Sequence, residues 1–170
     1  VFLSYEEYCK ETENRMVEAL FVSAGIGAVI AENASIAGAS GGCQAEIGSA
    51  SAMAAGGLAY LQGGDAECIA NAAAFALKNM LGLTCDPVCG LVEVPCIKRN
   101  SAGAVNAAVS AQMAMAGIKS AIPADEVVDS MRRIGNALPA ALRETSEGGL
   151  AVTESARKIA ERMGKKEHIA

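Results

Sequence analysis

Residues 102–116 read AGAVNAAVSAQMAMA, a stretch made almost entirely of small or unbranched side chains. Alanine is the strongest helix former and Met and Gln follow it closely, so this stretch predicts a long helix. Across the 170 residues the hydrophobic share is 52%, the aromatic share is 4%, and Trp is absent. We therefore expect a core of Ala, Val, Ile, Leu and Met on closely packed helices.

Helical patterns extend from this segment in both directions. Ser4-Tyr5-Glu6-Glu7 has the spacing of a capping box and predicts a helix that begins near residue 4, passes Met16 and frays at 23–27. A second apolar helix is predicted for about 25–36. The pattern resumes after residue 42 and stops at Gly63-Gly64.

The second half of the chain carries clear start and stop signals. Asp65 is a good N-cap for a helix that reaches about Met80. Pro123 and Asp125 open another helix, which is interrupted near Pro139. After the break at 148–149, Thr153 is predicted to cap a last amphipathic helix. No alternating strand pattern appears apart from the short LVEV at 91–94.

Two stretches lack a helical pattern and are predicted to be irregular. They are the Gly-rich segment 38–43 and the segment 84–100, and together they hold four of the six cysteines. The predicted fold class is therefore all-α, a compact multi-helix bundle with two irregular cysteine-bearing loops. Loops carried on a rigid scaffold are where functional sites usually lie.

Charge and hydropathy exclude several classes of function. The net charge is −5, which argues against nucleic-acid binding because that needs a basic surface. The apolar run at 16–31 falls short of the roughly 20 residues that span a bilayer, so we expect a buried core helix and no membrane partner. The start of the chain lacks the pattern of a secretory signal, which favours a reducing cytoplasm. The first residue is Val1, so a fragment or processed product is expected.

The densest group of cysteines is TCDPVCGLVEVPC at 84–96. Its C-x3-C-x6-C spacing matches neither a zinc ribbon nor a ferredoxin run, although thiolates hold both zinc and iron–sulfur clusters. The alternative is that cysteines serve as small buried hydrophobes, and we expect this of Cys9 and Cys68. Two prolines and Gly90 predict that the remaining cysteines of this segment, Cys85, Cys89 and Cys96, lie in a stiff, exposed loop. Spacing alone leaves a cluster, a zinc site and inert thiols open.

The segment ASGGCQAEIG at 39–48 places Cys43 at or near a helix start. The free N–H groups and the dipole of a helix N-terminus stabilise negative charge. Such a position would suit a thiolate-bound cluster or the carboxylate of a substrate. A plain Gly-rich turn between helices explains the same residues, so this segment does not decide by itself.

Three longer stretches carry a resemblance to a known family. They are SGGCQAEIGSASAMAAGGLA at 40–59, GLTCDPVCGLVEVPCIKRNSAGAV at 82–105 and RETSEGGLAV at 143–152. In this order they resemble the α chain, or catalytic domain, of the bacterial iron–sulfur L-serine dehydratases. The resemblance covers most of the chain from about 38 to 152, and it implies that residues 1–170 form a single helical catalytic (α) domain of a larger enzyme.

The resemblance implies a [4Fe–4S] cluster on Cys43, Cys85 and Cys96, with Cys89 not a ligand. The implied reaction converts L-serine to pyruvate and ammonia without pyridoxal phosphate. Three protein ligands leave one iron open as a Lewis acid for the substrate carboxylate and hydroxyl. The candidates for anchoring the carboxylate are Ser40, the amides of Gly41 and Gly42, Arg99, Asn100 and Arg143.

The same resemblance implies partners. In the family a Ser- and His-containing motif lies in a β domain or β chain, so we expect the general base there and an oligomeric assembly that binds L-serine. His168, the only His, is expected to be a solvated tail residue. No cysteine follows Gly148-Gly149, so the fourth iron is expected to be open or filled by substrate. Two alternatives remain: an L-cysteine desulfidase-like lyase, and a non-enzymatic helical domain, with zinc or without metal, that binds a partner.

Overall fold

The fold is all-α, as predicted. The computed structural model describes residues 1–164, so His168 and Lys165-Lys166 lie outside the described residues. The α-helices are α1 Phe2–Cys9, α2 Glu13–Asn33, α3 Gly38–Gly41, α4 Ser49–Leu61, α5 Ala66–Lys78, α6 Cys96–Met115, α7 Ala124–Ala137 and α8 Glu154–Arg162. Shorter turns are η1 Gln44–Gly48, η2 Val88–Gly90, η3 Ala140–Leu142 and η4 Gly149–Val152. Within residues 1–164 the short alternating LVEV pattern at 91–94 does not form a strand.

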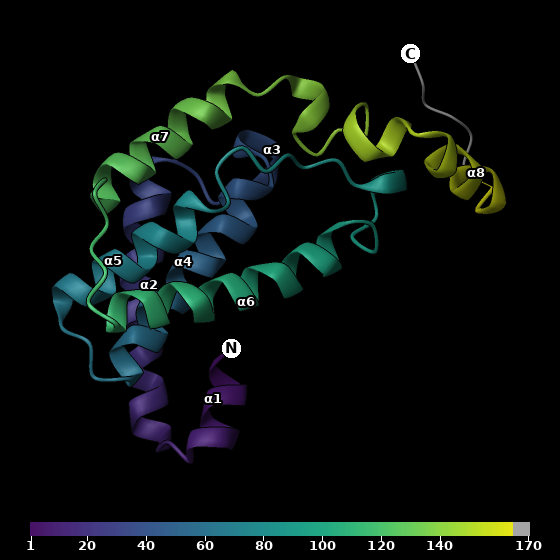
Figure 1. Cartoon of the computed structure of the whole chain (residues 1–170). Coiled ribbons are helices and arrows are strands. Elements are labelled where there is room, and N and C mark those ends of the chain that lie inside the picture. Colours follow the sequence, from purple (N-terminus) through teal and green to yellow (C-terminus); the bar gives the residue numbers. More distant parts are fainter. Residues whose placement is uncertain (165–170) are drawn as a thin grey trace.

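Helix α4 occupies the centre of the bundle. It packs against α2, α5 and α6, while α7 lies across α5 and α3 (Figure 1). The buried alanines of these helices have almost no exposed surface: Ala52, Ala55, Ala59, Ala72, Ala76, Ala107 and Ala111. Methyl side chains bring the helix backbones close together, which is how a chain poor in aromatic residues builds a dense core.

The contact between α2 and α4 depends on Gly57. A Cβ at this position would lie 2.4 Å from Phe2 Cζ, 2.5 Å from Ser23 Oγ and 3.0 Å from the Ala19 carbonyl oxygen. We expect Gly57→Ala to lower the free energy of unfolding by about 1–3 kcal/mol, the usual cost of overpacking a core. Urea unfolding followed by circular dichroism measures the change.

Gly25 provides the matched control. It lies within α2, is exposed, and has no atom within 4 Å of an added Cβ. Because alanine is the better helix former, Gly25→Ala should raise the free energy of unfolding by roughly 0.5–1 kcal/mol. Equal losses in the two variants would contradict the close approach of α2 to α4.

The N-terminal helices differ from their predicted bounds. The chain breaks at Lys10, which adopts a left-handed conformation with φ 53°. Thr12 then caps α2 by accepting a hydrogen bond from the Arg15 amide. The predicted fraying at 23–27 does not occur, because Ser23 Oγ donates to the Met53 carbonyl at 2.9 Å and holds this turn against α4.

Helix α2 is also longer than the apolar run at 16–31. It has 21 residues, and its most apolar window has a mean hydropathy of 1.4, so by length and composition it could cross a membrane. The expectation that this segment is too short to do so is therefore not confirmed. About 22% of that window is buried, on the face that packs against α4. One such helix is a weak indication, because core helices of other proteins have the same features.

The C-terminal part is held apart from the bundle. Helix α8 projects away from the other helices and contacts η2 and η4 (Figure 1).

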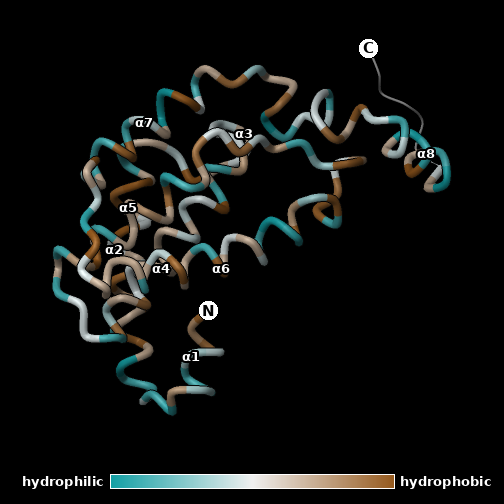
Figure 2. The backbone as a smooth tube through the Cα atoms, in the orientation of Figure 1, coloured by the Kyte–Doolittle hydropathy of each residue, from teal (hydrophilic) through white to brown (hydrophobic). Residues whose placement is uncertain are grey.

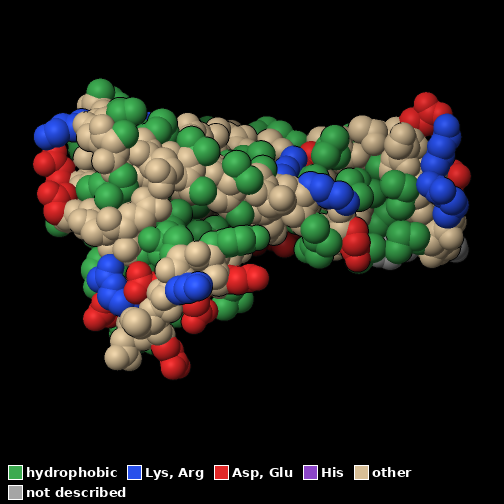
Figure 3. All heavy atoms as spheres, turned by 60° about the horizontal axis from the view of Figure 1, so that its bottom comes forward, with side chains coloured by type: hydrophobic (Ala, Val, Ile, Leu, Met, Phe, Trp, Pro, Cys, Tyr) green, Lys and Arg blue, Asp and Glu red, His purple; other side chains and the backbone are tan. Residues whose placement is uncertain are grey.

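The predicted caps are confirmed, since Asp65 accepts from the Cys68 amide and Thr153 accepts from the Ala156 amide. Hydrophilic residues gather at the turn between α1 and α2 and along α8 (Figure 2), and charged side chains are prominent at both ends of the molecule (Figure 3).

Candidate functional site

Cys43 is positioned by an irregular turn between α3 and α4. Gly42 has φ 76°, and a Cβ there would come within 2.8 Å of both Leu138 and the Leu83 carbonyl oxygen, so only glycine fits. The chain then enters the π-helical turn η1 directly after Cys43. π-turns inside helices are rare and are frequent at functional sites. Cys43 itself is completely buried.

Gln44 fixes this turn to the rest of the fold. Its side chain is fully buried, donates from Nε2 to the Met131 carbonyl at 3.0 Å and accepts from the Gly82 amide at 2.9 Å. The backbone N–H of Gln44 donates to the Leu83 carbonyl at 2.9 Å. One residue therefore joins the turn that carries Cys43 to α7 and to the start of the second cysteine segment.

Cys85 is held by the segment around residue 143. The Cys85 amide donates to the Leu142 carbonyl at 2.9 Å, and the Glu144 amide donates to the Cys85 carbonyl at 2.7 Å. These bonds form an isolated parallel bridge between Cys85 and Arg143. Cys85 is only 2% exposed, so the prediction of an exposed loop is wrong at this position. The reason is this long-range pairing.

Cys96 is the first residue of α6, after Pro95. The loop before it is closed by two backbone bonds, from Val88 to the Val94 carbonyl and from Ile97 to the Val92 carbonyl. Cys96 is partly exposed. As the first residue of α6 it lies at the positive end of the helix dipole, which would stabilise a negatively charged group.

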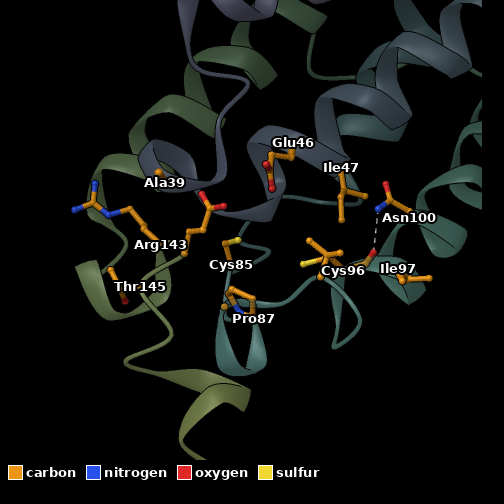
Figure 4. A pocket seen from close by; sticks show the side chains of 13 residues that line it. Ala39, Glu46, Ile47, Cys85, Pro87, Cys96, Ile97, Asn100, Arg143 and Thr145 are labelled. Atoms are coloured by element: carbon orange, nitrogen blue, oxygen red, sulfur yellow. Dashed lines mark hydrogen bonds between the residues drawn. The ribbon is translucent and has the colours of Figure 1, made fainter. Parts of the chain in front are cut away.

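The three cysteines predicted as ligands converge in space. The sulfurs of Cys43 and Cys85 and a carboxylate oxygen of Glu46 all lie within 4.8 Å of one another, and the Cys96 thiol interacts with that of Cys43. Cys85 and Cys96 line a pocket of about 830 Å³, and Figure 4 shows them facing the same space as Glu46. A set of thiolates is the donor set that iron–sulfur clusters use, so these residues fit such a group.

Burial affects the protonation of the Cys85 and Cys96 thiols. It raises the pKa of Cys85 and Cys96, and the neighbouring Cys43 adds to both shifts, while Arg99 partly offsets the shift at Cys96. The thiols of Cys85 and Cys96 are therefore protonated at neutral pH in the absence of a metal. Because metal ligands must be thiolates, loading releases protons and is favoured as the pH rises.

The remaining cysteines lie outside this group. Cys9 is exposed at the end of α1, so the prediction that it is a buried hydrophobe is wrong, because α1 packs only its other face. Cys68 is partly buried, and its sulfur lies 3.5 Å from that of Met115, as a packing role requires. Cys89 has φ 57° in η2 and does not line the pocket.

Three predicted substrate-binding residues lie elsewhere in the structure. Ser40 Oγ contacts Ser35 and donates to the Ala37 carbonyl, and it does not line the cysteine pocket. The amides of Gly41 and Gly42 donate to the carbonyls of Ala37 and Gly38 at 3.0 and 2.8 Å. These amides are engaged in a helical turn, so the structure does not offer them to a carboxylate.

Asn100 and Arg143 do line the pocket, whereas Arg99 does not. Asn100 donates from Nδ2 to the Cys96 carbonyl, which leaves its side-chain oxygen free to accept a bond. The Arg143 guanidinium points away from the cysteines (Figure 4). Its Nε atom is buried and has no hydrogen-bond partner within the described part of the chain.

Two acidic residues at the site were not predicted. Glu46 and Glu144 both line the pocket, and neither forms an ion pair among residues 1–164. Partial desolvation, followed by repulsion from Glu144, raises the pKa of Glu46 above its ordinary value. The spacing of Glu46, one helical turn after Cys43, was a signal that could have indicated it.

Comparison with known proteins points to one family. The family described as "Serine dehydratase alpha chain" matches residues 1–151. A Bacillus subtilis (strain 168) protein named "Probable L-serine dehydratase, alpha chain" is 54% identical over 158 residues, which cover 93% of this chain and 53% of that protein. A Latilactobacillus sakei protein of the same name is 58% identical over 134 residues, covering 79% of this chain and 64% of that protein.

A third relative, "L-serine dehydratase, alpha chain" of Peptoniphilus asaccharolyticus, is 53% identical over 137 residues, covering 81% of this chain and 47% of that protein. The chain thus spans about half the length of the curated relatives it matches. The family match covers most of the chain and includes all three converging cysteines. This chain belongs to the serine dehydratase alpha chain family.

Proposed function

We propose that this chain is the cluster-bearing part of an L-serine dehydratase, which converts L-serine to pyruvate and ammonia. The observation that carries the proposal is the clustering of three cysteines within a chain of this family: Cys85 and Cys96 line one pocket, and the buried Cys43 lies beside both of them. We propose these three residues as ligands of a [4Fe–4S] cluster, with no pyridoxal phosphate. When bound, the cluster supplies a Lewis acid that activates the β-hydroxyl as a leaving group.

The residues of the chain itself would hold and orient the substrate. The unpartnered Nε–H of Arg143 suits the α-carboxylate, although the guanidinium would have to turn toward the cysteines from the position shown in Figure 4. The side-chain oxygen of Asn100 can accept a bond from the hydroxyl or the ammonium group. The carboxylates of Glu46 and Glu144 make the same pocket attractive to the ammonium group. The pocket therefore has a group suited to each end of an amino acid.

We propose that a β domain or β chain covers this pocket and supplies the general base, in an oligomeric enzyme. The pocket lining contains no His or Lys among the described residues. Val92 and Ile97, which line the pocket, are 60% and 53% exposed and form an apolar rim that a partner could bury. We place this enzyme in a reducing cytoplasm, where the cysteines stay available as thiols for a cluster.

Spectroscopy and turnover test this proposal together. After anaerobic loading with iron and sulfide, L-serine is expected to change the electron paramagnetic resonance spectrum of the reduced cluster, and D-serine is not. Pyruvate release is expected only when the chain is co-expressed with its β domain or β chain, because the base lies there. Faster release from L-cysteine than from L-serine would favour a desulfidase instead. No response to either amino acid would contradict the proposed function.

A further inference from the structure

The Arg99 guanidinium lies against Cys43 and does not line the pocket. Its Nη1 atom lies 2.7 Å from the Thr84 carbonyl oxygen, 2.7 Å from Asp86 Oδ1 and 3.7 Å from Cys43 Sγ. The side chain is 19% exposed and does not line the pocket, although the next residue, Asn100, does. The guanidinium therefore donates to the sulfur of Cys43, a proposed ligand, from outside the pocket.

Asp86 holds Arg99 in this position. Its side chain is 4% exposed, and its two oxygens have different partners. Oδ1 accepts from Arg99, and Oδ2 accepts from the Leu150 amide at 2.8 Å. Asp86 directly follows Cys85 in the sequence, so one carboxylate connects the Cys85 backbone to α6 and to the segment that contains Leu150, and Arg99 extends this connection to Cys43. Such a buried pair keeps the guanidinium from turning toward solvent.

Arg99 keeps its positive charge in this position. Burial alone would lower the pKa of Arg99, but its bonds to Asp86 and Cys43 outweigh that effect and raise it. A permanent donor to a cysteine sulfur stabilises the thiolate, and hydrogen bonds to sulfur are one of the factors that set the reduction potential of a cluster. Groups that orient metal ligands in this way affect metal affinity without touching the metal.

We propose that Arg99, held by Asp86, is a positioning residue that donates a hydrogen bond to the Cys43 sulfur and thereby sets cluster retention and potential. In this arrangement Arg99 does not anchor the substrate carboxylate, a role that falls to Arg143. The proposal rests on the proposed cluster at Cys43, Cys85 and Cys96. It adds a function for two residues that lie outside the pocket.

Two variants of the anaerobically loaded chain test this proposal. Arg99→Gln removes the charged donor, and Asp86→Asn keeps the shape of the side chain but removes the charge that holds Arg99. We expect both to lose iron to a chelator about 10- to 100-fold faster than the unchanged chain, which is the usual effect of removing a group that orients a ligand. Arg99→Gln should also shift the reduction potential to more negative values.

Lys98→Gln is the matched control. Lys98 is exposed, precedes Arg99 on α6 and donates from its side chain to the Glu93 carbonyl, away from the cysteines, so iron loss and potential should stay unchanged. Arg99→Lys keeps the charge and is expected to restore part of the retention. If Arg99→Gln does not fold, the rates of iron loss from Asp86→Asn and Arg99→Lys still test the proposal.

The outcomes separate the two proposals. An Arg99→Gln chain with unchanged iron loss and potential but weaker L-serine binding would show a carboxylate anchor and overturn the positioning role. Unchanged retention in Asp86→Asn would overturn the proposed coupling through Asp86. An unchanged chain that takes up no iron and sulfide would overturn the proposed cluster, and this inference with it.

Discussion

Cys85→Ala is expected to abolish cluster binding, lowering iron from about four atoms per chain to almost none after anaerobic loading. Cys85 lies beside the other two proposed ligands: its sulfur is within 4.8 Å of that of Cys43, and Cys96 lines the same pocket. Its backbone is fixed by two hydrogen bonds to the segment 142–144, so no other thiol can move into its place. Iron and sulfide analysis, together with visible absorption, measures the loss.

Cys89→Ala is the matched control for this experiment. Cys89 is four residues away in the same loop, so the two substitutions remove the same chemical group from one segment. Because Cys89 does not line the pocket, its variant should retain the full amount of iron and sulfide. Full iron in Cys85→Ala, or its loss in Cys89→Ala, would show that the ligand assignment is wrong.

Gly149→Ala is expected to destabilise the chain by about 2–4 kcal/mol, from left-handed strain and the loss of a hydrogen bond to a charged group. Gly149 has φ 58°, and a Cβ there would lie 2.4 Å from Asp86 Oδ2. Asp86 cannot move away easily, because Arg99 and the Leu150 amide hold its two oxygens. Urea unfolding measures the change.

Gly117→Ala separates strain from contact. Gly117 has φ 80°, but no atom lies within 4 Å of an added Cβ. Its substitution should therefore cost only the strain, about 1–2 kcal/mol. If Gly149→Ala cost no more than Gly117→Ala, the close packing of Gly149 on Asp86 would be refuted.

Local sequence signals predicted much of the helical framework. The caps at Asp65 and Thr153 form as expected, because each depends on residues within one helical turn. The end of α7 before Pro139 also follows a local rule. The break at Lys10 was missed, because the capping-box spacing at Ser4 gave no indication that the helix would stop.

The site depended on long-range pairing that local patterns do not encode. Cys85 becomes buried because the chain near Arg143 pairs with it, 58 positions later. Arg99 has the right chemistry for a carboxylate, but Asp86 engages it first. The spacing of the cysteines indicated a thiolate site, and the family resemblance selected three of the six. Gln44, which fixes the turn at Cys43, carried no distinctive local signal.

The central claim is that Cys43, Cys85 and Cys96 together hold a [4Fe–4S] cluster. Anaerobic iron and sulfide content per folded chain, measured beside the variant that lacks all three cysteines, tests this claim most directly. We predict about four iron and four sulfide per unchanged chain and none in the triple variant. Zinc in place of iron, or equal iron and sulfide in the two chains, would contradict it.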